Sequence, residues 1–415
     1  MDTTLDRFLA FLDASPTPHH AVAAAAAALG ATGFVEGDGK APAKGMMSRG
    51  GSLFAWRRGR RPPEKSGFRL IAAHTDSPNL RVKPQPLVRS HGYVRLGVEV
   101  YGGVQVATWV DRDLGLAGVV HVRDGDGVAS RLVDVRRPVA RVPTLAIHLN
   151  RSVNEDGLKL NAQTELPAVL GQETETGADG DLLRRMLAAE IGCAEGDVLT
   201  WDLALVDLAP ATRGGANGEF VFSGRLDNLG STHAAVEALL AAGDADETAV
   251  IALFDHEEIG SRTNRGADGR ALETVLKSLS DDVEAALSRS MLVSADMAHA
   301  IHPAFADKSE AEHAPKMNGG PAIKLNVNQR YSSEGSTTAR FVLLCERAEV
   351  PYQWYVHRSD MACGSTVGPM VAARVGVASV DVGNPMLSMH SAREQCGAHD
   401  HDRMVRVMTL FLEGE

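Results

Sequence analysis

The N-terminal part of the chain begins with two helical patterns. Apolar side chains recur every three or four positions over residues 3–13, which predicts an amphipathic helix. A second helix is expected to begin at Thr17, which can cap it, with Pro18 in its first turn and Gly30 at its end. Both helices precede the first strand-like segment, which begins near residue 52.

Apolar runs of strand length follow these helices and return after residue 220. Residues 52–56 and 68–73 predict strands, and the second run is apolar enough to be a buried strand. Beyond residue 220 the expected elements are strands at 248–254, 290–295 and 377–382 and a helix over 272–288. Strands that alternate with helices favour an α/β fold, with a mostly parallel (mixed) sheet and helices on both faces.

The pattern changes over residues 85–220. Apolar and polar residues alternate from Val94 to Tyr101, which is typical of a strand with one buried and one wetter face. Further short strands are expected at 118–122, 130–135 and 145–149, and a polar surface loop at 172–180. We therefore predict a discontinuous α/β domain of residues 1–84 and 221–415, with an inserted, mainly β domain of residues 85–220.

Composition narrows the class of protein. Of the 415 residues, 44% are hydrophobic and 23% are charged, values close to those of average globular proteins. The net charge of -11, without a long run of Lys and Arg, argues against nucleic acid as a partner. We expect no contact with a membrane and a cytoplasmic location, because the sequence has no apolar stretch of about 20 residues and no signal-peptide pattern at its start. The four cysteines form no C-x-x-C pair, which fits reduced, buried thiols.

Polar clusters follow three of the expected strands directly. Parallel strands present their carboxyl ends at one edge of a sheet, where ligands bind. The clusters are His74-Thr75-Asp76, Asp255-His256-Glu257-Glu258 and Asp296, and the motifs around Asp227 and His390 add further candidates. Imidazole and carboxylate groups without thiolates suit catalytic zinc, cobalt or manganese rather than a closed structural zinc site.

The number of candidate ligands points to two ions. Five protein ligands are too many for one catalytic ion that must keep an open position, but they serve two ions if one carboxylate bridges, and we assign the bridge to Asp227. Two ions roughly 3.5 to 4 Å apart can polarise a carbonyl group and activate a water molecule. Such a site hydrolyses amides.

Two neighbouring glutamates are expected to divide the work. Glu257 and Glu258 leave a strand end together and cannot easily both bind one metal ion, so one should be a ligand and the other the general base. Asp76 lies two residues beyond His74 and can accept the second imidazole N–H, which would fix the tautomer that binds metal.

Four motifs together resemble those of the aspartyl aminopeptidases of the M18 metallopeptidase family. They are Ser15 to Val22, Ala73 to Pro78, Asp255 to Ser261 and Ser388 to Glu394, and they run nearly from end to end of the chain. The resemblance implies that Glu257 is the general base and that the metal ligands are His74, Asp227 as the bridge, Glu258, Asp296 and His390. One departure is His19, where many relatives would carry an aromatic residue.

The resemblance also implies an assembly and a substrate class. Residues 85–220 are similar to a dimerisation domain, and such enzymes assemble as dodecamers, in which His148 would reach a neighbouring subunit's active site. Lys324 matches a lysine that binds an acidic substrate side chain. His299 lies just past Asp296 and could touch substrate or simply pack.

The sequence therefore predicts a two-metal aminopeptidase. Two divalent ions, zinc or else manganese or cobalt, would be bound, and Glu257 would accept a proton from a water that bridges them. The substrates would be peptides with a free N-terminus, with a preference for Asp or Glu there. The alternatives are another amide hydrolase on the same metal site, such as a carboxypeptidase or an N-acyl amino-acid deacylase, and a metal-binding scaffold without activity.

Overall fold

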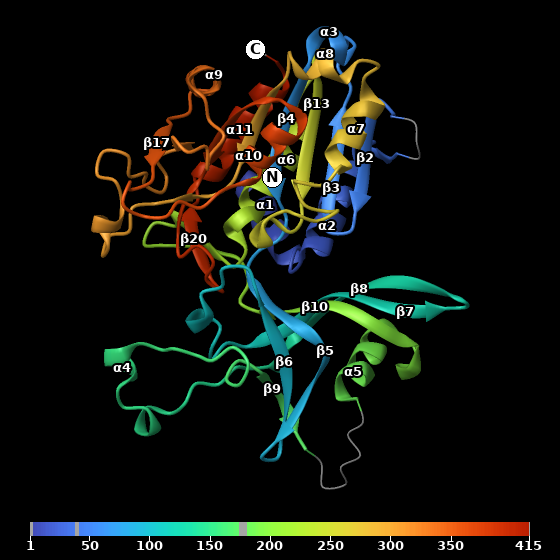
Figure 1. Cartoon of the computed structure of the whole chain (residues 1–415), viewed down its shortest axis with the longest axis vertical. Coiled ribbons are helices and arrows are strands. Elements are labelled where there is room, and N and C mark those ends of the chain that lie inside the picture. Colours follow the sequence, from blue (N-terminus) through green and yellow to red (C-terminus); the bar gives the residue numbers. More distant parts are fainter. Residues whose placement is uncertain (1–2, 38–40, 174–180, 415) are drawn as a thin grey trace. The chain divides into compact units, whose positions relative to one another are not determined.

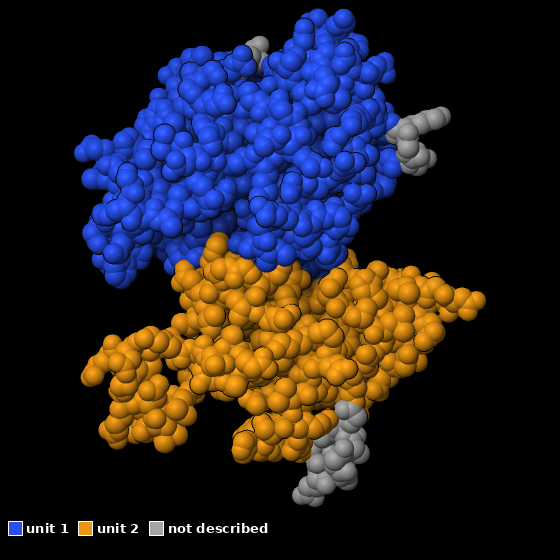
Figure 2. All heavy atoms as spheres, viewed as in Figure 1, with its two compact units in different colours: residues 1–77, 211–389, 394–415 blue, residues 78–210, 390–393 orange. Residues whose placement is uncertain are grey.

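The computed structural model describes residues 3–37, 41–173 and 181–414. Two compact units divide the chain, and Figure 2 colours them separately. The first unit comprises residues 1–77, 211–389 and 394–415. The second comprises residues 78–210, and the short segment 390–393 groups with it, which the sequence did not indicate.

A nine-stranded mixed sheet forms the centre of the first unit (Figure 1). Its four inner strands, β13, β4, β14 and β18, are parallel to their neighbours, whereas β3 and β16 flank them in the antiparallel sense. In order across the sheet, the strands are β1 (Val35–Glu36), β2 (Lys44–Arg49), β3 (Ser52–Arg57), β13 (Thr248–Phe254), β4 (Phe68–His74), β14 (Met291–Ala295), β18 (Ala378–Gly383), β16 (Ala322–Leu325) and β17 (Gln353–Val356).

Helices cover both faces of this sheet. Successive side chains of a strand point to opposite faces, so the apolar inner strands present a hydrophobic surface on each side. In β4, Ile71 and Ala73 pack into one hydrophobic core, and Leu70 and Ala72 pack into another. The first core includes residues of α1 (Thr4–Ala14), α2 (Pro18–Gly30), α6 (Leu226–Ala241), α9 (Gly335–Arg347) and α11 (Asp400–Leu412). The second includes residues of α7 (Ala271–Leu279), α8 (Val283–Leu287) and α10 (Val367–Val375). The predicted α/β class is confirmed.

The helix predicted over residues 272–288 is wrong, because the chain forms two helices there. α7 ends at Leu279, and the Asp282 side chain accepts a hydrogen bond of 3.0 Å from the N–H of Ala285 to begin α8. An aspartate that satisfies a free N–H at a helix start favours a new helix over a continuous one. The first two helices and the strands at 248–254, 290–295 and 377–382 lie where the pattern predicted them, to within a residue or two.

Smaller elements complete the first unit. The short helix α3 spans Pro63–Ser66. A second, five-stranded sheet has the order β11 (Thr212–Gly214), β12 (Phe220–Ser223), β20 (Glu394–Gly397), β19 (Pro385–Leu387) and β15 (Ala298–His299).

The second unit is built on a six-stranded antiparallel sheet with its own hydrophobic core. The strand order is β8 (Gly127–Ala140), β7 (Leu114–Asp124), β10 (Val198–Asp207), β5 (Asn79–Ser90), β6 (Tyr93–Tyr101) and β9 (Ala168–Gln172). Two helices, α4 (Val153–Asp156) and α5 (Leu182–Ile191), belong to the same unit.

One strand predicted in this unit is wrong. Residues 145–149 contain a single 3-10 turn at Ile147–Leu149 and pair with no strand of the described chain. The side chains of Leu145, Ile147 and Leu149 are 60%, 47% and 74% exposed, so the apolar run does not alternate between a buried and a wet face. The loop predicted over residues 172–180 lies outside the described residues from position 174 onward.

Candidate metal centre

Three neighbouring strands bring the predicted side chains to one edge of the sheet. β13, β4 and β14 are parallel, with Phe254 in register with His74, so their carboxyl ends lie together. His74 is the last residue of β4, while Glu257 begins a 3-10 turn just after β13 and Asp296 follows β14 directly. The fourth element is the start of α6, which carries Asp227.

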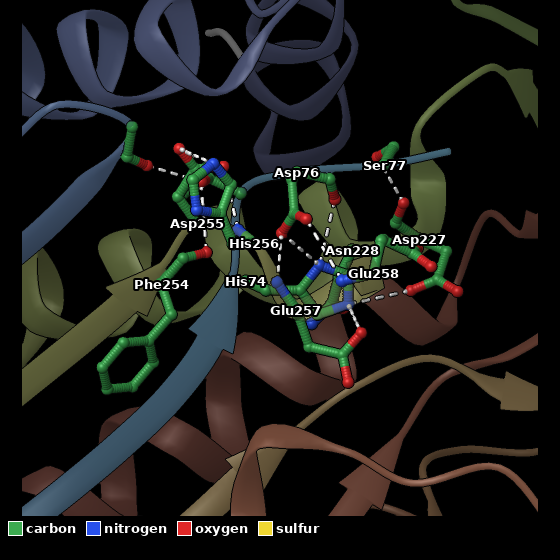
Figure 3. Close-up of polar contacts among 12 residues, drawn as sticks. His74, Asp76, Ser77, Asp227, Asn228, Phe254, Asp255, His256, Glu257 and Glu258 are labelled. Atoms are coloured by element: carbon green, nitrogen blue, oxygen red, sulfur yellow. Dashed lines mark hydrogen bonds and ion pairs between the residues drawn. The ribbon is translucent and has the colours of Figure 1, made fainter. Parts of the chain in front are cut away.

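The side chains converge on the imidazole of His74 (Figure 3). Its Nε2 lies 3.4 Å from Oδ1 of Asp227, 3.9 Å from Oδ1 of Asp296 and 4.0 Å from Oε2 of Glu257. Within the first unit, the possible ligand atoms of His74, Asp227 and Asp296 lie within 4.8 Å of one another, and so do those of His74, Glu257 and Glu258. The structure thus brings together five of the residues that the sequence singled out.

Burial sets the electrostatics of this cluster. It raises the pKa of Glu257 to about 8, against the charge of His74 and with the help of the neighbouring carboxylates. Burial likewise raises the pKa of Asp296 to about 6 and that of Glu258 well above its usual range. For His74 burial acts in the opposite direction, but its contacts with Asp227 and Asp76 hold the pKa well above the ordinary value.

These shifts indicate which kind of ligand fits the cluster. Several carboxylates share a space from which water is largely excluded, and their mutual repulsion favours proton uptake unless a cation is bound. Imidazole nitrogen and carboxylate oxygen atoms are ligands of zinc and related divalent ions. The donor set therefore fits divalent metal ions.

Asp76 contacts more of the site than the sequence suggested. The Nδ1 atom of His74 lies 3.0 Å from the backbone carbonyl oxygen of Asp76 and 3.4 Å from its carboxylate. The same carboxylate accepts hydrogen bonds from the backbone N–H groups of Glu257, at 3.1 Å, and Glu258, at 3.2 Å. Asp76 therefore fixes both the imidazole and the turn that carries the two glutamates.

Four side chains around the cluster were missed by the sequence reasoning. Ser77, Asn228, Thr232 and Glu394 all hydrogen bond to backbone groups of the strand ends or of Asp227. Ser77 and Glu394 fall inside motifs that had been noted, but a serine or glutamate that binds a backbone group leaves no distinct signal in a sequence.

Lys324 and His299 lie in the first unit, and His299 is not among the possible metal ligands grouped around His74. Lys324 is only 2% exposed, its Nζ donates to the carbonyl oxygen of Met297 at 3.2 Å, and the ring of Tyr331 is 5.0 Å away. Its charge lowers the pKa of Asp296, which burial raises. His299 is exposed and packs 6.0 Å from the ring of Tyr355.

His148 and His390 belong to the second unit. His148 lies in the exposed 3-10 turn at Ile147–Leu149 rather than in a strand. Nδ1 of His390 lies 3.0 Å from the carbonyl oxygen of Gly103, a contact that leaves the lone pair on Nε2 when Nδ1 carries the proton. The roles predicted for both histidines stay predictions.

Comparison with known proteins assigns the family. A family model described as aminopeptidase I zinc metalloprotease (M18) matches residues 11–412. The chain belongs to the M18 family. A probable M18 family aminopeptidase 2 of Pseudomonas aeruginosa is 49% identical to this M18 protein, over 97% of this chain and 96% of the relative.

Solved structures share the fold of this M18 protein over its whole length. A chain of the Ape4 and Nbr1 complex superposes with a TM-score of 0.95 at 38% identity, covering 99% of this chain and 85% of the other. The mApe1 dodecamer of S. cerevisiae superposes with a TM-score of 0.86 at 27% identity, covering 100% and 97%. The predicted class is confirmed: this M18 protein is a metallo-aminopeptidase, a hydrolase of N-terminal peptide bonds. Among the described residues, no helix is long and apolar enough to cross a membrane.

Proposed function

We propose that the chain removes single residues from the N-terminus of peptides with two divalent ions, zinc in the first place, in the cluster around His74. The ligands would be His74, Asp227 as the bridge, Glu258, Asp296 and His390. The observation that carries the proposal is the buried set of carboxylates around one imidazole, with Asp227, Asp296 and Glu257 within 4.0 Å of His74 Nε2. Such a set repels itself when it is ionised without a cation.

Glu257 is the residue that moves the proton in this proposal. When bound, such ions would polarise the scissile carbonyl group and lower the pKa of the attacking water. The Glu257 carboxylate accepts a proton from the attacking water and donates it to the leaving amine. The hydrogen bond from the backbone N–H of Glu257 to the Asp76 carboxylate supports this role. It holds the turn that directs the Glu257 carboxylate toward the cluster.

The test of this role is Glu257→Gln, which keeps the size of the side chain and removes its basicity. We expect kcat to fall by about 10²- to 10⁴-fold while the metal content stays at the wild-type level. Glu273→Gln, on the exposed face of α7, is the matched control and should keep full activity. Wild-type turnover by a fully metallated Glu257→Gln enzyme would exclude Glu257 as the base.

Lys324 supports a preference for N-terminal Asp or Glu. The buried ammonium group of Lys324 contacts a carbonyl oxygen and an aromatic ring, and it can gain an ion pair from an acidic substrate. His299 would line the same region. Amides of Asp and Glu should therefore be cleaved faster than those of Leu and Lys, and Lys324→Met should raise KM for the acidic substrates alone.

The substrate panel also separates the alternatives. N-acetyl-Asp amide should resist cleavage by an aminopeptidase, whereas a deacylase would act on it and a carboxypeptidase would require a free C-terminus. Metal binding without turnover of any substrate would favour a scaffold. Preferential cleavage of Leu would keep the aminopeptidase and exclude the proposed role of Lys324.

A homo-oligomer of dimers, closing into a dodecamer, is the assembly we propose, in the cytoplasm. The dodecamer of the S. cerevisiae relative supports it, as do the exposed side chains of Leu145, Ile147 and Leu149 in the region proposed for dimerisation, residues 85–220. His148 would then contribute to a neighbouring active site. A species near 44.1 kDa by light scattering would exclude this assembly.

A further inference from the structure

The backbone of Asp227 is buried and departs from helical geometry at the start of α6. Asp227 is 3% exposed, and its φ of -84° and ψ of 104° are not helical. Arg225, two positions before Asp227, has a positive φ of 60°. A buried N–H or C=O group outside a helix or sheet must find another partner, since leaving it unpaired costs free energy.

Two side chains from distant parts of the chain provide these partners. The Ser77 hydroxyl donates to the Asp227 carbonyl oxygen at 2.5 Å, as Figure 3 shows. On the other side of the residue, the backbone N–H of Asp227 donates to Oε2 of Glu394 at 3.2 Å. Both side chains are themselves buried, at 6% and 2% exposed.

The same contacts connect Asp227 to His74. Ser77 follows the His74-Thr75-Asp76 segment directly, so its hydrogen bond ties the end of β4 to the start of α6. Thr232, one turn into α6, donates to the carbonyl oxygen of His74 at 2.7 Å. These bonds hold the segments whose side chains place His74 Nε2 and Asp227 Oδ1 3.4 Å apart.

We infer that Ser77 and Glu394 are positioning residues for the metal centre, because they hold the Asp227 peptide group from both ends and so set the position of its carboxylate. The inference rests on the proposed metal site. Neither side chain needs to touch an ion or a substrate to act in this way. Loss of a group that orients a metal ligand typically costs about 10- to 100-fold in metal affinity.

Ser77→Ala is the most direct variant, because it removes one oxygen atom and leaves the Asp227 carbonyl without that donor. We expect the dissociation constant for zinc, measured by competition with a chromophoric chelator, to rise about 10-fold. Ser290→Ala is the matched control. Ser290 is equally buried, at 6% exposed, and its hydroxyl accepts a bond from Phe68 N–H at the opposite end of β4. This control should lower the Tm and leave zinc affinity unchanged.

Glu394 allows a second comparison that separates hydrogen bonding from side-chain size. Glu394→Gln keeps an oxygen that can accept the Asp227 N–H and should retain zinc within a few-fold of the wild type. Glu394→Met has a similar length and no such acceptor, so its zinc affinity should fall about 10-fold. The Tm of each variant after chelation reports whether the metal-free fold is intact.

The outcomes are distinct. Wild-type zinc affinity in Ser77→Ala would overturn the inference, and this variant decides alone if Glu394→Met does not fold. An equal loss of affinity in Ser290→Ala would also overturn it, since general destabilisation would then explain the effect. A wild-type protein that binds no zinc would reject the proposed metal centre itself, a different failure from unchanged variants of a protein that binds it.

Discussion

Removing divalent ions should make the protein less stable as the pH rises above 7. In the metal-free fold, His74, Glu257, Glu258 and Asp296 all bind protons more tightly than they would in the unfolded chain. Where the folded state binds more protons, the free energy of unfolding falls as the pH rises. The experiment therefore removes the divalent ions with a chelator and then measures stability at a series of pH values.

The size of this loss of stability can be worked out for Glu257. Burial raises the pKa of Glu257 from its ordinary value of 4.5 to about 8. The stabilisation of the folded state by the protonated Glu257 is therefore fully present below pH 4.5 and is lost as the pH rises through about 8. One pKa unit corresponds to about 1.4 kcal/mol, so the step from pH 7 to pH 8 costs about 1 kcal/mol through this residue alone. His74 adds a loss of the same sign.

The assay is thermal unfolding at pH 7, 8 and 9, with and without saturating divalent ion. A loss of 1 kcal/mol lowers the Tm by roughly 2–4 °C in a domain of about 200 residues. The glutamine side chain in Glu257→Gln cannot titrate, so the Tm of the metal-free variant should decrease less between pH 7 and pH 9. With the ions bound, the carboxylates are held ionised and the decrease should disappear.

A Tm of the chelated protein that stays constant or rises between pH 7 and pH 9 would refute this reasoning. A decrease of equal size in the metal-loaded protein would also count against it, since the effect would then arise elsewhere. Calorimetry in buffers of different ionisation enthalpy provides an independent check, because zinc binding at pH 7 should release protons from the cluster.

Three further predictions concern stability. Burial lowers the pKa of His233 to about 3 and that of His401 well below 6.5, and the two rings hydrogen bond at 2.8 Å, so the Tm of the metal-loaded protein should fall as the pH drops below about 6.5. Gly368→Ala should cost about 1–3 kcal/mol in denaturant unfolding, because the new Cβ would lie 2.6 Å from the Asp381 carboxylate. Asp282→Ala should cost about 1 kcal/mol in the same assay, through loss of the cap of α8.

The strand ends of the candidate site could be predicted because two signals coincide there. The apolar runs before His74, Glu257 and Asp296 mark buried parallel strands, and the polar residues that follow mark the edge where such strands end. Asp227 was found through its motif rather than its periodicity, since its backbone at the start of α6 is not helical.

The errors arose where local pattern and tertiary packing differ. The apolar residues from Leu145 to Leu149 have the composition of a strand, but a strand requires a partner, which none of the described segments provides there. The break between α7 and α8 depends on one side-chain cap at Asp282. The hydrogen bonds of Ser77 and Glu394 to Asp227 depend on contacts between residues 150 or more positions apart, which no local pattern encodes.

The order of strands in the central sheet has a consequence for synthesis of the chain. β4 is the central partner of both β13 and β14, but Thr248, the first residue of β13, is translated more than 170 residues after His74. At about 5–20 residues per second, this nascent strand, in which five of seven side chains are apolar, waits roughly ten seconds or longer for either neighbour. During that interval both of its edges are open to pairing with other chains, so this strand is a point at which the growing polypeptide is exposed to aggregation until its partners emerge.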